Sequence, residues 1–321
     1  MTRRSSVVIA LFGVLAAAAS TAFVIRQDGS PPTVEELVRE IEQLQKDVKE
    51  LRAALPTAGT VGVLQNLEVP DAMTLCGQPV PLDRPEVREA LAFELVLTAG
   101  RPTMPLLWMR RAPAVLPAIE QRIAARQLPA DLKYLPMIES DMRWIPESPA
   151  GAVGLWQFIQ STGKHYGLRV DRTLDERMDP DRATDAALAY LTELHREFGD
   201  WFLAFASYNV GEAYVRQAMA EQGTRDYFQL WLPLETRRYV FRMLAAKLVF
   251  DAPEKYGLFR MVPLYSPKYR TLEVNVGRGT SGDLREIARR EKVPYLALRA
   301  HNPQVRGNQL PAGKSTLRIP E

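Results

Sequence analysis

Glu139 lies in the hexapeptide MIESDM (residues 137–142), directly after LKYLP, a stretch typical of the apolar face of a helix. A carboxyl group beside apolar side chains is partly desolvated, which favours its neutral form and raises its pKa. A group that donates a proton at neutral pH needs such a raised pKa. Taken alone, however, the hexapeptide is explained better by a structural glutamate at a helix end, satisfied by backbone groups or by a neighbour such as Arg143.

Three further stretches combine aromatic rings with amides or hydroxyls. GAVGLWQFI supplies glycines for close backbone approach and an amide between two aromatic rings, a surface that suits sugars. ASYNVG places a phenol beside an amide at the end of an apolar helix, and ETRRYV adds a second phenol. Each stretch is weak evidence alone, because Trp and Tyr at helical spacing are usually core residues. Together they contribute Gly154, Gln157, Phe158, Ile159, Tyr208, Asn209 and Tyr239.

The sequence offers only one well-framed carboxylate for acid catalysis. Glycosidases ordinarily use two carboxyl groups, one as acid and one as nucleophile or base. Asp141 faces a different direction from Glu139 if the helix continues, and Glu147 and Asp171 lie in loop-like sequence. The usual two-carboxylate arrangement is therefore not supported.

The elements that must position these residues are almost all helical between Pro85 and Phe250. Pro85 and Pro113 indicate helix starts, as does Asp181 ahead of ATDAALAYL, and GLWQFIQSTGKHYG is included among the helical stretches. The last fifty residues differ: LEVNV alternates like a strand, two short helical stretches follow, and GKSTLRIP predicts a closing strand. This separate module holds more Arg and Lys than Asp and Glu, an excess that a solvated surface largely explains.

Composition excludes several classes of protein. A hydrophobic fraction of 46% in 321 residues fits an ordered chain with a sizeable core. The single cysteine, Cys76, rules out a disulfide framework within the chain, and the three histidines are scattered, so no metal site is expected. The formal charge of +3 permits an acidic polymer or an anionic membrane as partner, but no nucleic-acid motif is present.

The N-terminus predicts export. Arg3 and Arg4 precede an uncharged run from Ser5 to Ile25, which is near the lower limit for spanning a bilayer. An uncleaved inner-membrane anchor is favoured, because FVI continues the apolar run beyond LAAAAS; a cleaved signal peptide is the alternative.

Residues 33–55 predict a coiled-coil helix. Apolar residues recur three and four apart, the seam of a coiled coil, with Glu and Lys between them. Homo-oligomerisation through residues 34–55 and a lone amphipathic helix explain the pattern about equally well. The seam consists of Val34, Leu37, Ile41, Leu44, Val48, Leu51 and Leu55.

The four chemical stretches occur in an order that resembles the lytic transglycosylases of bacterial cell walls. They are similar to the membrane-bound type D group, which has a lysozyme-like SLT domain, and the resemblance covers about Leu128 to Val249. The matching stretches are ADLKYLPMIES, GAVGLWQFIQSTGKHYGL, AFASYNVGEAYVRQA and LPLETRRYVFRMLA. LCGQPVPLDRPEVREALAFELVL resembles the helical lead-in of such proteins. The C-terminal module is similar to a LysM domain, although GTSGDLREIARREKV departs from the usual GDTLWSIA pattern.

The resemblance implies a mechanism with one carboxyl group. Glu139 would protonate the bond between N-acetylmuramic acid and N-acetylglucosamine, then take the proton of the muramic C6 hydroxyl as that hydroxyl attacks C1, giving a 1,6-anhydro sugar. No cofactor is implied, and the partners are glycan strands. The resemblance also implies supporting roles. Tyr208 would form a hydrogen bond near Glu139, and Tyr239 would be a second phenol there. Gln157 and Asn209 would bind the sugar or the catalytic loop, Phe158 and Ile159 would line the cleft, and Ser140 would form a local bond to the glycan or the loop.

The predicted fold is therefore mainly α, with a lysozyme-like catalytic domain and a small C-terminal βααβ module. We expect a periplasmic protein anchored in the inner membrane. Two alternatives remain: a muramidase that hydrolyses the same bond, as goose-type lysozymes do, and a noncatalytic wall-binding scaffold. The expected parts are a signal or anchor at 1–28, the coiled-coil helix at 33–55, a connector at 56–84, a lead-in at 85–127, the SLT domain at 128–252 and the LysM-like module at 268–320.

Overall fold

The computed structural model describes residues 46, 67–144, 147–258, 268–277 and 281–321. The predicted signal segment and nearly all of the predicted coiled coil lie outside these residues. Within the described part of the chain, no helix is both long enough and apolar enough to cross a membrane. The elements below all belong to the unit Val63–Glu321.

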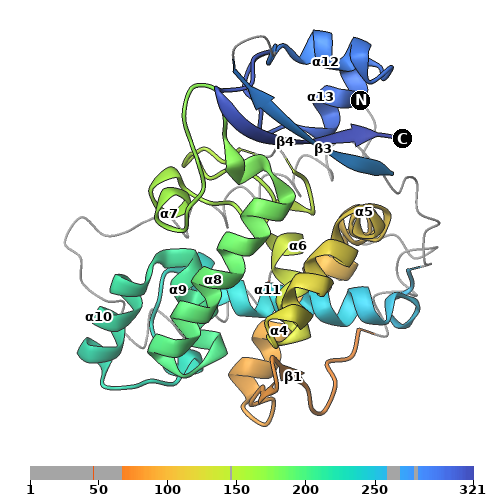
Figure 1. Ribbon diagram of the computed structural model, residues 1–321. Coiled ribbons are helices and arrows are strands. Elements are labelled where there is room, and N and C mark those ends of the chain that lie inside the picture. Colours follow the sequence, from red (N-terminus) through yellow and green to blue (C-terminus); the bar gives the residue numbers. More distant parts are fainter. Residues whose placement is uncertain (1–45, 47–66, 145–146, 259–267, 278–280) are drawn as a thin grey trace, which may run out of the picture. The chain divides into compact units, whose positions relative to one another are not determined.

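Helices dominate the described residues, which confirms the mainly α fold class (Figure 1). Among the residues described from 67 on, a small hairpin of two-residue strands, β1 (Thr74–Leu75) and β2 (Gln78–Pro79), precedes them. The α-helices up to residue 251 are α4 (Pro85–Ala99), α5 (Thr103–Ala125), α6 (Leu135–Ser140), α7 (Gln160–His165), α8 (Pro180–Phe198), α9 (Trp201–Val210), α10 (Glu212–Gln222) and α11 (Leu234–Asp251). Short 3-10 turns are η1 (Ala130–Tyr134), η2 (Glu176–Met178), η3 (Tyr227–Gln229) and η4 (Pro253–Tyr256).

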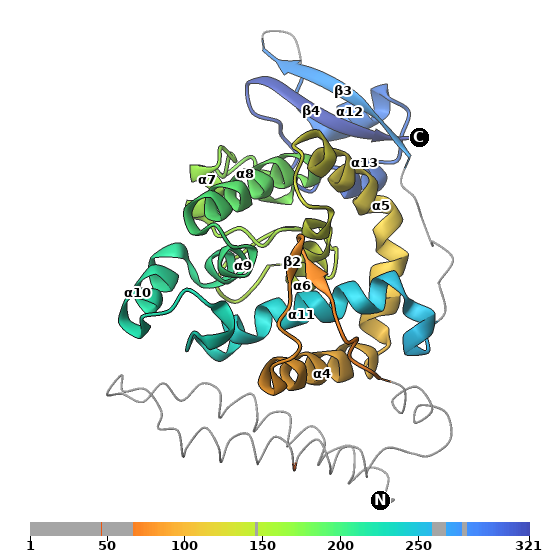
Figure 2. The same cartoon turned by 90° about the horizontal axis from the view of Figure 1, so that it is seen from below.

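One large hydrophobic core joins these helices. Helix α11 packs against both α4 and α6 (Figure 2), and it also contacts α9, which in turn packs on α8. Trp156, Phe205 and Leu244 are fully buried in this core. The core therefore fixes α6, α9 and α11, the three helices that carry the candidate acid and phenols.

Helix α8 begins with a well-formed cap. Asp179, not Asp181, precedes its first turn, and the Asp179 carboxylate accepts hydrogen bonds from the backbone N–H groups of Asp181 and Arg182 at 2.9 and 3.1 Å. Pro180 occupies the first helical position, where a missing N–H costs nothing. The sequence therefore indicated this helix correctly but placed its cap two residues late.

The prediction that Pro113 begins a helix is wrong. Helix α5 runs from Thr103 through both Pro113 and Pro117. A proline inside a helix costs about 3 kcal/mol or more through the lost hydrogen bond and a steric clash. The buried face of α5, which includes Trp108 and Ile119, continues across both prolines, and this packing outweighs that cost.

The helix expected over GLWQFIQSTGKHYG is only partly present. Residues 154–157 form a turn that is closed by a bridge between Val153 and Phe158, and Gln157 has a φ of 51°. Helix α7 starts only at Gln160. The apolar residues of the turn are buried without helical geometry, which explains why a pattern based on hydrophobicity missed it.

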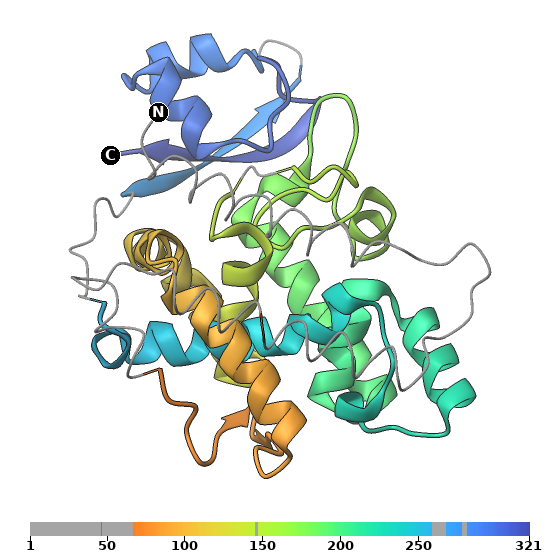
Figure 3. The same ribbon diagram turned by 180° about the vertical axis from the view of Figure 1, so that it is seen from behind.

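Residues 269–320 have the predicted order of strand, helix, helix and strand. β3 (Tyr269–Val276) pairs antiparallel with β4 (Gly313–Pro320), from Tyr269 opposite Pro320 to Val276 opposite Gly313. Helices α12 (Leu284–Arg290) and α13 (Tyr295–His301) lie together on one side of this pair (Figure 3). The LysM-like character of this C-terminal module and the predicted domain boundaries remain predictions.

Candidate active site

Glu139 occupies the last turn of the short helix α6. Leu135 and Met137 of the same helix are fully buried, whereas Glu139 is partly buried. The hydroxyl of Tyr239, on α11, donates a hydrogen bond to the Glu139 carboxylate. The structure thus brings together two predicted residues that lie 100 positions apart in the sequence.

The surroundings of Glu139 favour its protonated form. Burial raises the pKa of Glu139 from its ordinary value of 4.5 to about 7, against the hydrogen bond from Tyr239 and the charge of Arg242, which lower it. The negative charge of Glu235 raises it further. Near neutral pH, Glu139 therefore populates both the acid and the carboxylate, as a group that first donates and then accepts a proton must.

The two predicted phenols have different partners. Tyr239 is 1% exposed, and burial together with the charge of Glu139 raises its pKa well above the ordinary value. Burial and Glu139 likewise raise the pKa of Tyr208, whose hydroxyl donates to the carbonyl oxygen of Trp156 at 2.7 Å. Both phenols are therefore neutral donors; Tyr239 binds the acid directly, and Tyr208 holds the neighbouring loop.

That loop, residues 151–158, carries Gln157. Its chain direction reverses through a backbone hydrogen bond from Val153 N to Phe158 O at 3.0 Å, and the Gln157 side-chain amide donates to the Gly154 carbonyl at 2.8 Å. Gln157 adopts a left-handed backbone conformation, which is uncommon for a residue with a side chain. Such conformations persist where the surroundings impose them, and they cluster at functional sites.

Sequence reasoning missed the residue that holds this loop from the other side. The Arg177 guanidinium donates to the carbonyl oxygens of Gly151 and Phe158, both at 3.0 Å. Asp175 binds the same guanidinium through two hydrogen bonds, at 2.9 and 2.8 Å. In the sequence, this pair is visible only as an acid and an arginine two residues apart in DERMDP. That pattern is too common to identify a functional pair.

Asn209 links two helices of the site. Its side-chain oxygen accepts a hydrogen bond of 2.7 Å from the hydroxyl of Thr236, which is buried on α11. This bond ties the end of α9, where Tyr208 lies, to the turn of α11 that precedes Tyr239. Thr236 is a second residue that the sequence did not single out.

Three predicted neighbours of Glu139, namely Ser140, Phe158 and Ile159, differ in their exposure to solvent. Ser140 is 1% exposed, and its hydroxyl donates to the Pro136 carbonyl at 3.1 Å within the helix. The expected contact of Ser140 with glycan or with the loop stays a prediction. Phe158 is also buried, and its ring packs on that of Tyr208 with centroids 6.3 Å apart, so it supports the site from within. Ile159 is 47% exposed and is available to line a surface.

Two of the other candidate carboxylates, Asp141 and Asp171, are engaged elsewhere. Asp141 accepts a hydrogen bond of 3.1 Å from the Trp108 indole. Asp171 is held by Arg169 and Thr173, and these hydrogen bonds lower its pKa. Neither residue is placed as a second catalytic carboxyl group. Among the described residues, no group of His, Cys, Asp and Glu side chains could hold a metal ion.

A row of tyrosine rings extends from Tyr208. The Tyr208 and Tyr190 ring centroids lie 5.3 Å apart, and those of Tyr190 and Tyr166 lie 4.8 Å apart. Tyr190 and Tyr166 line a surface hollow of about 440 Å³ together with Glu193 and Glu212. These two carboxylates accept hydrogen bonds from the two phenols, at 3.0 Å for Glu193 and 3.1 Å for Glu212.

The partly buried acid Glu139 thus lies in a helical domain built from α6, α8, α9, α11 and the 151–158 loop. Comparison with known proteins identifies the class of this domain. Residues 118–230 match the Transglycosylase SLT domain family. This matched region is called the SLT domain below.

Among individual proteins, the chain is similar to membrane-bound lytic murein transglycosylase D of Escherichia coli (strain K12). The two are 32% identical over 209 residues, which is 63% of this chain and 45% of the relative. The chain is also 33% identical over 109 residues to peptidoglycan transglycosylase gp16 of Escherichia phage T7, covering 33% of this chain and 8% of the phage protein. The chain thus spans less than half the length of these relatives.

The solved structure of the 70 kDa soluble lytic transglycosylase from Escherichia coli shares 17% identity with this chain. The match covers 71% of this chain and 47% of that protein, with a TM-score of 0.39.

Proposed function

We propose that this protein is a peptidoglycan lytic transglycosylase that cleaves the β-1,4 bond between N-acetylmuramic acid and N-acetylglucosamine. The observation that carries the proposal is Glu139, a partly buried acid with a pKa of about 7 that accepts a hydrogen bond from Tyr239. The SLT match and the similarity to a murein transglycosylase supply the substrate class.

Protonated Glu139 donates its proton to the glycosidic oxygen as the bond from that oxygen to C1 of the muramic residue breaks. The N-acetylglucosamine end leaves as an alcohol, and Glu139 becomes a carboxylate that Tyr239 stabilises by its hydrogen bond. The muramic C6 hydroxyl then attacks C1, its proton passes to Glu139, and a 1,6-anhydro ring closes. The acid is regenerated, and no water is consumed.

A tethered hydroxyl explains why one carboxyl group suffices. A nucleophile held in the right geometry has an effective concentration far above that of any group free in solution. The second carboxylate of ordinary glycosidases activates or replaces an external nucleophile, a task that the substrate's own C6 hydroxyl performs here. The engagement of Asp141 with Trp108 agrees with this one-acid mechanism.

The glycan would approach along the aromatic row from Tyr208 to Tyr166. Aromatic faces and carboxylate acceptors suit the apolar faces and the N–H or hydroxyl groups of sugars. The hollow beside Tyr190 offers both kinds of group. Exposed Ile159 adds apolar surface next to the Gln157 loop.

The substitution Glu139→Gln tests the proposal directly. Glutamine is nearly isosteric but has no proton of suitable acidity, so release of anhydro-muropeptides from purified sacculi should fall to background while binding to sacculi is retained. Turnover near the wild-type level in this variant would refute the assignment.

The mass of the wild-type digest products separates the rivals. Anhydro ends support a lytic transglycosylase, whereas reducing ends one water heavier indicate a hydrolytic muramidase. Binding of wild-type protein without any product indicates a wall-binding scaffold.

We further propose that the protein acts in the periplasm, held at the inner membrane by its N-terminal segment, with residues 34–55 forming an oligomeric stalk. The apolar run from Ser5 to Ile25 and the heptad pattern support this arrangement. The mass of the detergent-solubilised full-length chain, compared with a version that starts at Pro70, tests the stalk. Loss of oligomers in the shorter version is expected, and identical oligomeric states would end the idea.

A further inference from the structure

The C-terminal module shares a hydrophobic core with the SLT domain. Leu174 precedes helix α8 by six residues, yet its side chain packs within the cluster formed by the module's Leu284, Val305 and Leu317. Backbone hydrogen bonds of 2.8 Å run in both directions, from Asp175 N to Gln304 O and from Arg306 N to Thr173 O. This is the arrangement of a strand-like contact with a side-chain anchor, so residues 173–175 belong structurally to both parts.

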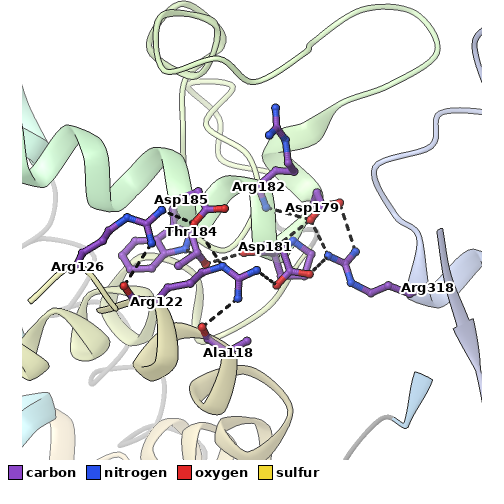
Figure 4. A network of polar contacts seen from close by, with 11 residues as sticks. Ala118, Arg122, Arg126, Asp179, Asp181, Arg182, Thr184, Asp185 and Arg318 are labelled. Carbon is purple, nitrogen blue, oxygen red and sulfur yellow. Dashed lines mark hydrogen bonds and ion pairs between the residues drawn. The ribbon is translucent and has the colours of Figure 1, made fainter. Parts of the chain in front are cut away.

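Two arginines of the module bind carboxylates of the SLT domain. Arg318, whose side chain is 7% exposed, lies 2.7 Å from the Asp179 carboxylate that caps α8, and it also pairs with Asp181 (Figure 4). Asp181 in turn pairs with Arg122 of α5 at 2.8 Å. Arg306 pairs with Asp175, which is fully buried. A buried carboxylate is costly unless it is paired, so the module's guanidinium groups offset the cost of burying these acids.

Asp175 connects the module to the candidate active site. Its carboxylate is bound by Arg306 of the module and by Arg177, and Arg177 donates to the carbonyls of Gly151 and Phe158 at the two ends of the Gln157 loop. A path of charge-assisted hydrogen bonds therefore leads from Arg306 through Asp175 and Arg177 to that loop. Hydrogen bonds between charged groups are roughly twice as strong as neutral ones, so this path can transmit a positional constraint.

From these contacts we propose that Arg306 is a positioning residue: through Asp175 and Arg177, the docked C-terminal module holds the 151–158 loop in its productive position. The module thereby affects the chemical step in addition to any contact it makes with glycan. The effect on turnover rests on the proposed function, whereas the mechanical link between module and loop does not.

The substitution Arg306→Gln tests the link, because it removes one guanidinium partner of Asp175 while Asp175 keeps Arg177. The Arg306 side chain is 45% exposed, so glutamine fits in its place. Arg290→Gln is the matched control, since Arg290 lies in the same module, is 52% exposed and pairs with its neighbour Glu291 at 2.9 Å. Arg306→Lys retains the positive charge, so it should retain most of the wild-type behaviour in the two measurements below.

Hydrogen exchange measures the link without any substrate. In Arg306→Gln, the amides of Asp175 and Val153, which bond to Gln304 O and Phe158 O, should exchange faster by on the order of tenfold, the factor for one lost charge-assisted hydrogen bond. Unchanged protection at Val153 would overturn the proposal, whether or not Asp175 loses protection. This result is independent of whether the protein is a transglycosylase.

Kinetics separates positioning from tethering. If the module positions the loop, Arg306→Gln should lower kcat on soluble glycan oligomers by on the order of tenfold, below the hundredfold that a 1 Å misplacement can cost. A higher KM with kcat unchanged would mean that the module only recruits glycan, and it would overturn the proposal. Arg290→Gln should match the wild type in both measurements.

Discussion

In the proposed mechanism Glu139 serves as acid in one step and as base in the next, and its hydrogen bond from Tyr239 bears on both steps. Burial pushes the pKa of Glu139 upward, and the phenol hydrogen bond holds it down, so the value of about 7 is a balance. An acid with a much higher pKa would donate slowly and stay protonated, and one with a lower pKa would be ionised before the reaction began. Groups around Glu139 should therefore shift the pH dependence in predictable directions.

Glu235 and Arg242 lie in the same helix and should shift that dependence in opposite directions. The proposed mechanism requires protonated Glu139, so kcat/KM should fall as the pH rises through about 7. Arg242 stabilises the carboxylate, so Arg242→Gln should raise the pKa of Glu139 and move this fall to higher pH. Glu235 destabilises the carboxylate, so Glu235→Gln should lower the pKa and move the fall to lower pH.

Each shift should be smaller than about one pH unit, because salt screens partly exposed charges. The pH profile of kcat/KM measures both variants, with Glu221→Gln as the control, since Glu221 lies on α10 and bonds only to Gln217 among the described contacts. Shifts of the same sign in both variants would contradict the electrostatic explanation.

Among the elements, the 151–158 loop depends on a close backbone approach at Gly154. A Cβ atom there would lie 1.9 Å from the Arg177 carbonyl oxygen, and the φ of 84° is in the left-handed region. Gly154→Ala should therefore reduce the free energy of unfolding by about 3 kcal/mol through strain and clash, and it should displace the loop. Denaturant unfolding measures the loss.

Gly151→Ala is the matched control for this prediction. Gly151 lies in the same loop with a φ of 75°, but its Cβ would meet nothing within 4 Å. Its cost should be about 1 kcal/mol, from the backbone conformation alone. Equal losses in the two variants would show that the contact with Arg177 is not what makes Gly154 necessary.

The sequence predicted elements better than it predicted their partners. Helical periodicity located most helices, because it reports the buried face directly. It placed a helix start at Pro113, inside α5, and extended a helix over the Gln157 turn, because in both places tertiary packing overrides local preference. Local sequence carries no information on such packing.

The candidate site was accessible only in part from the residues. The apolar surroundings of Glu139 gave the sign of its pKa shift, but only the family resemblance linked it to Tyr239. Arg177 and Arg306 were not identified, because an arginine looks the same in the sequence whether it faces solvent or a buried aspartate. The solvated surface assumed for the module thus hides two arginines that bind the SLT domain.

At the scale of the whole molecule, the module and the SLT domain are less separable than a composition change near residue 268 implies. Arg318 and Arg306 are far from Asp179 and Asp175 in the sequence, yet each binds a carboxylate with which the SLT domain organises its own structure. One of these carboxylates caps α8, and the other holds Arg177. The stability of the SLT domain is therefore coupled to that of the module.

Because Leu174 lies in the core of the C-terminal module, the chain cannot be divided between the SLT domain and the module without exposing apolar surface. A truncation after residue 258 would cut through a shared interior, leaving a bare leucine at the new surface and Asp175 with one guanidinium partner fewer. The truncated protein should therefore aggregate. Poor activity in such a preparation would reflect damaged folding rather than a loss of glycan affinity.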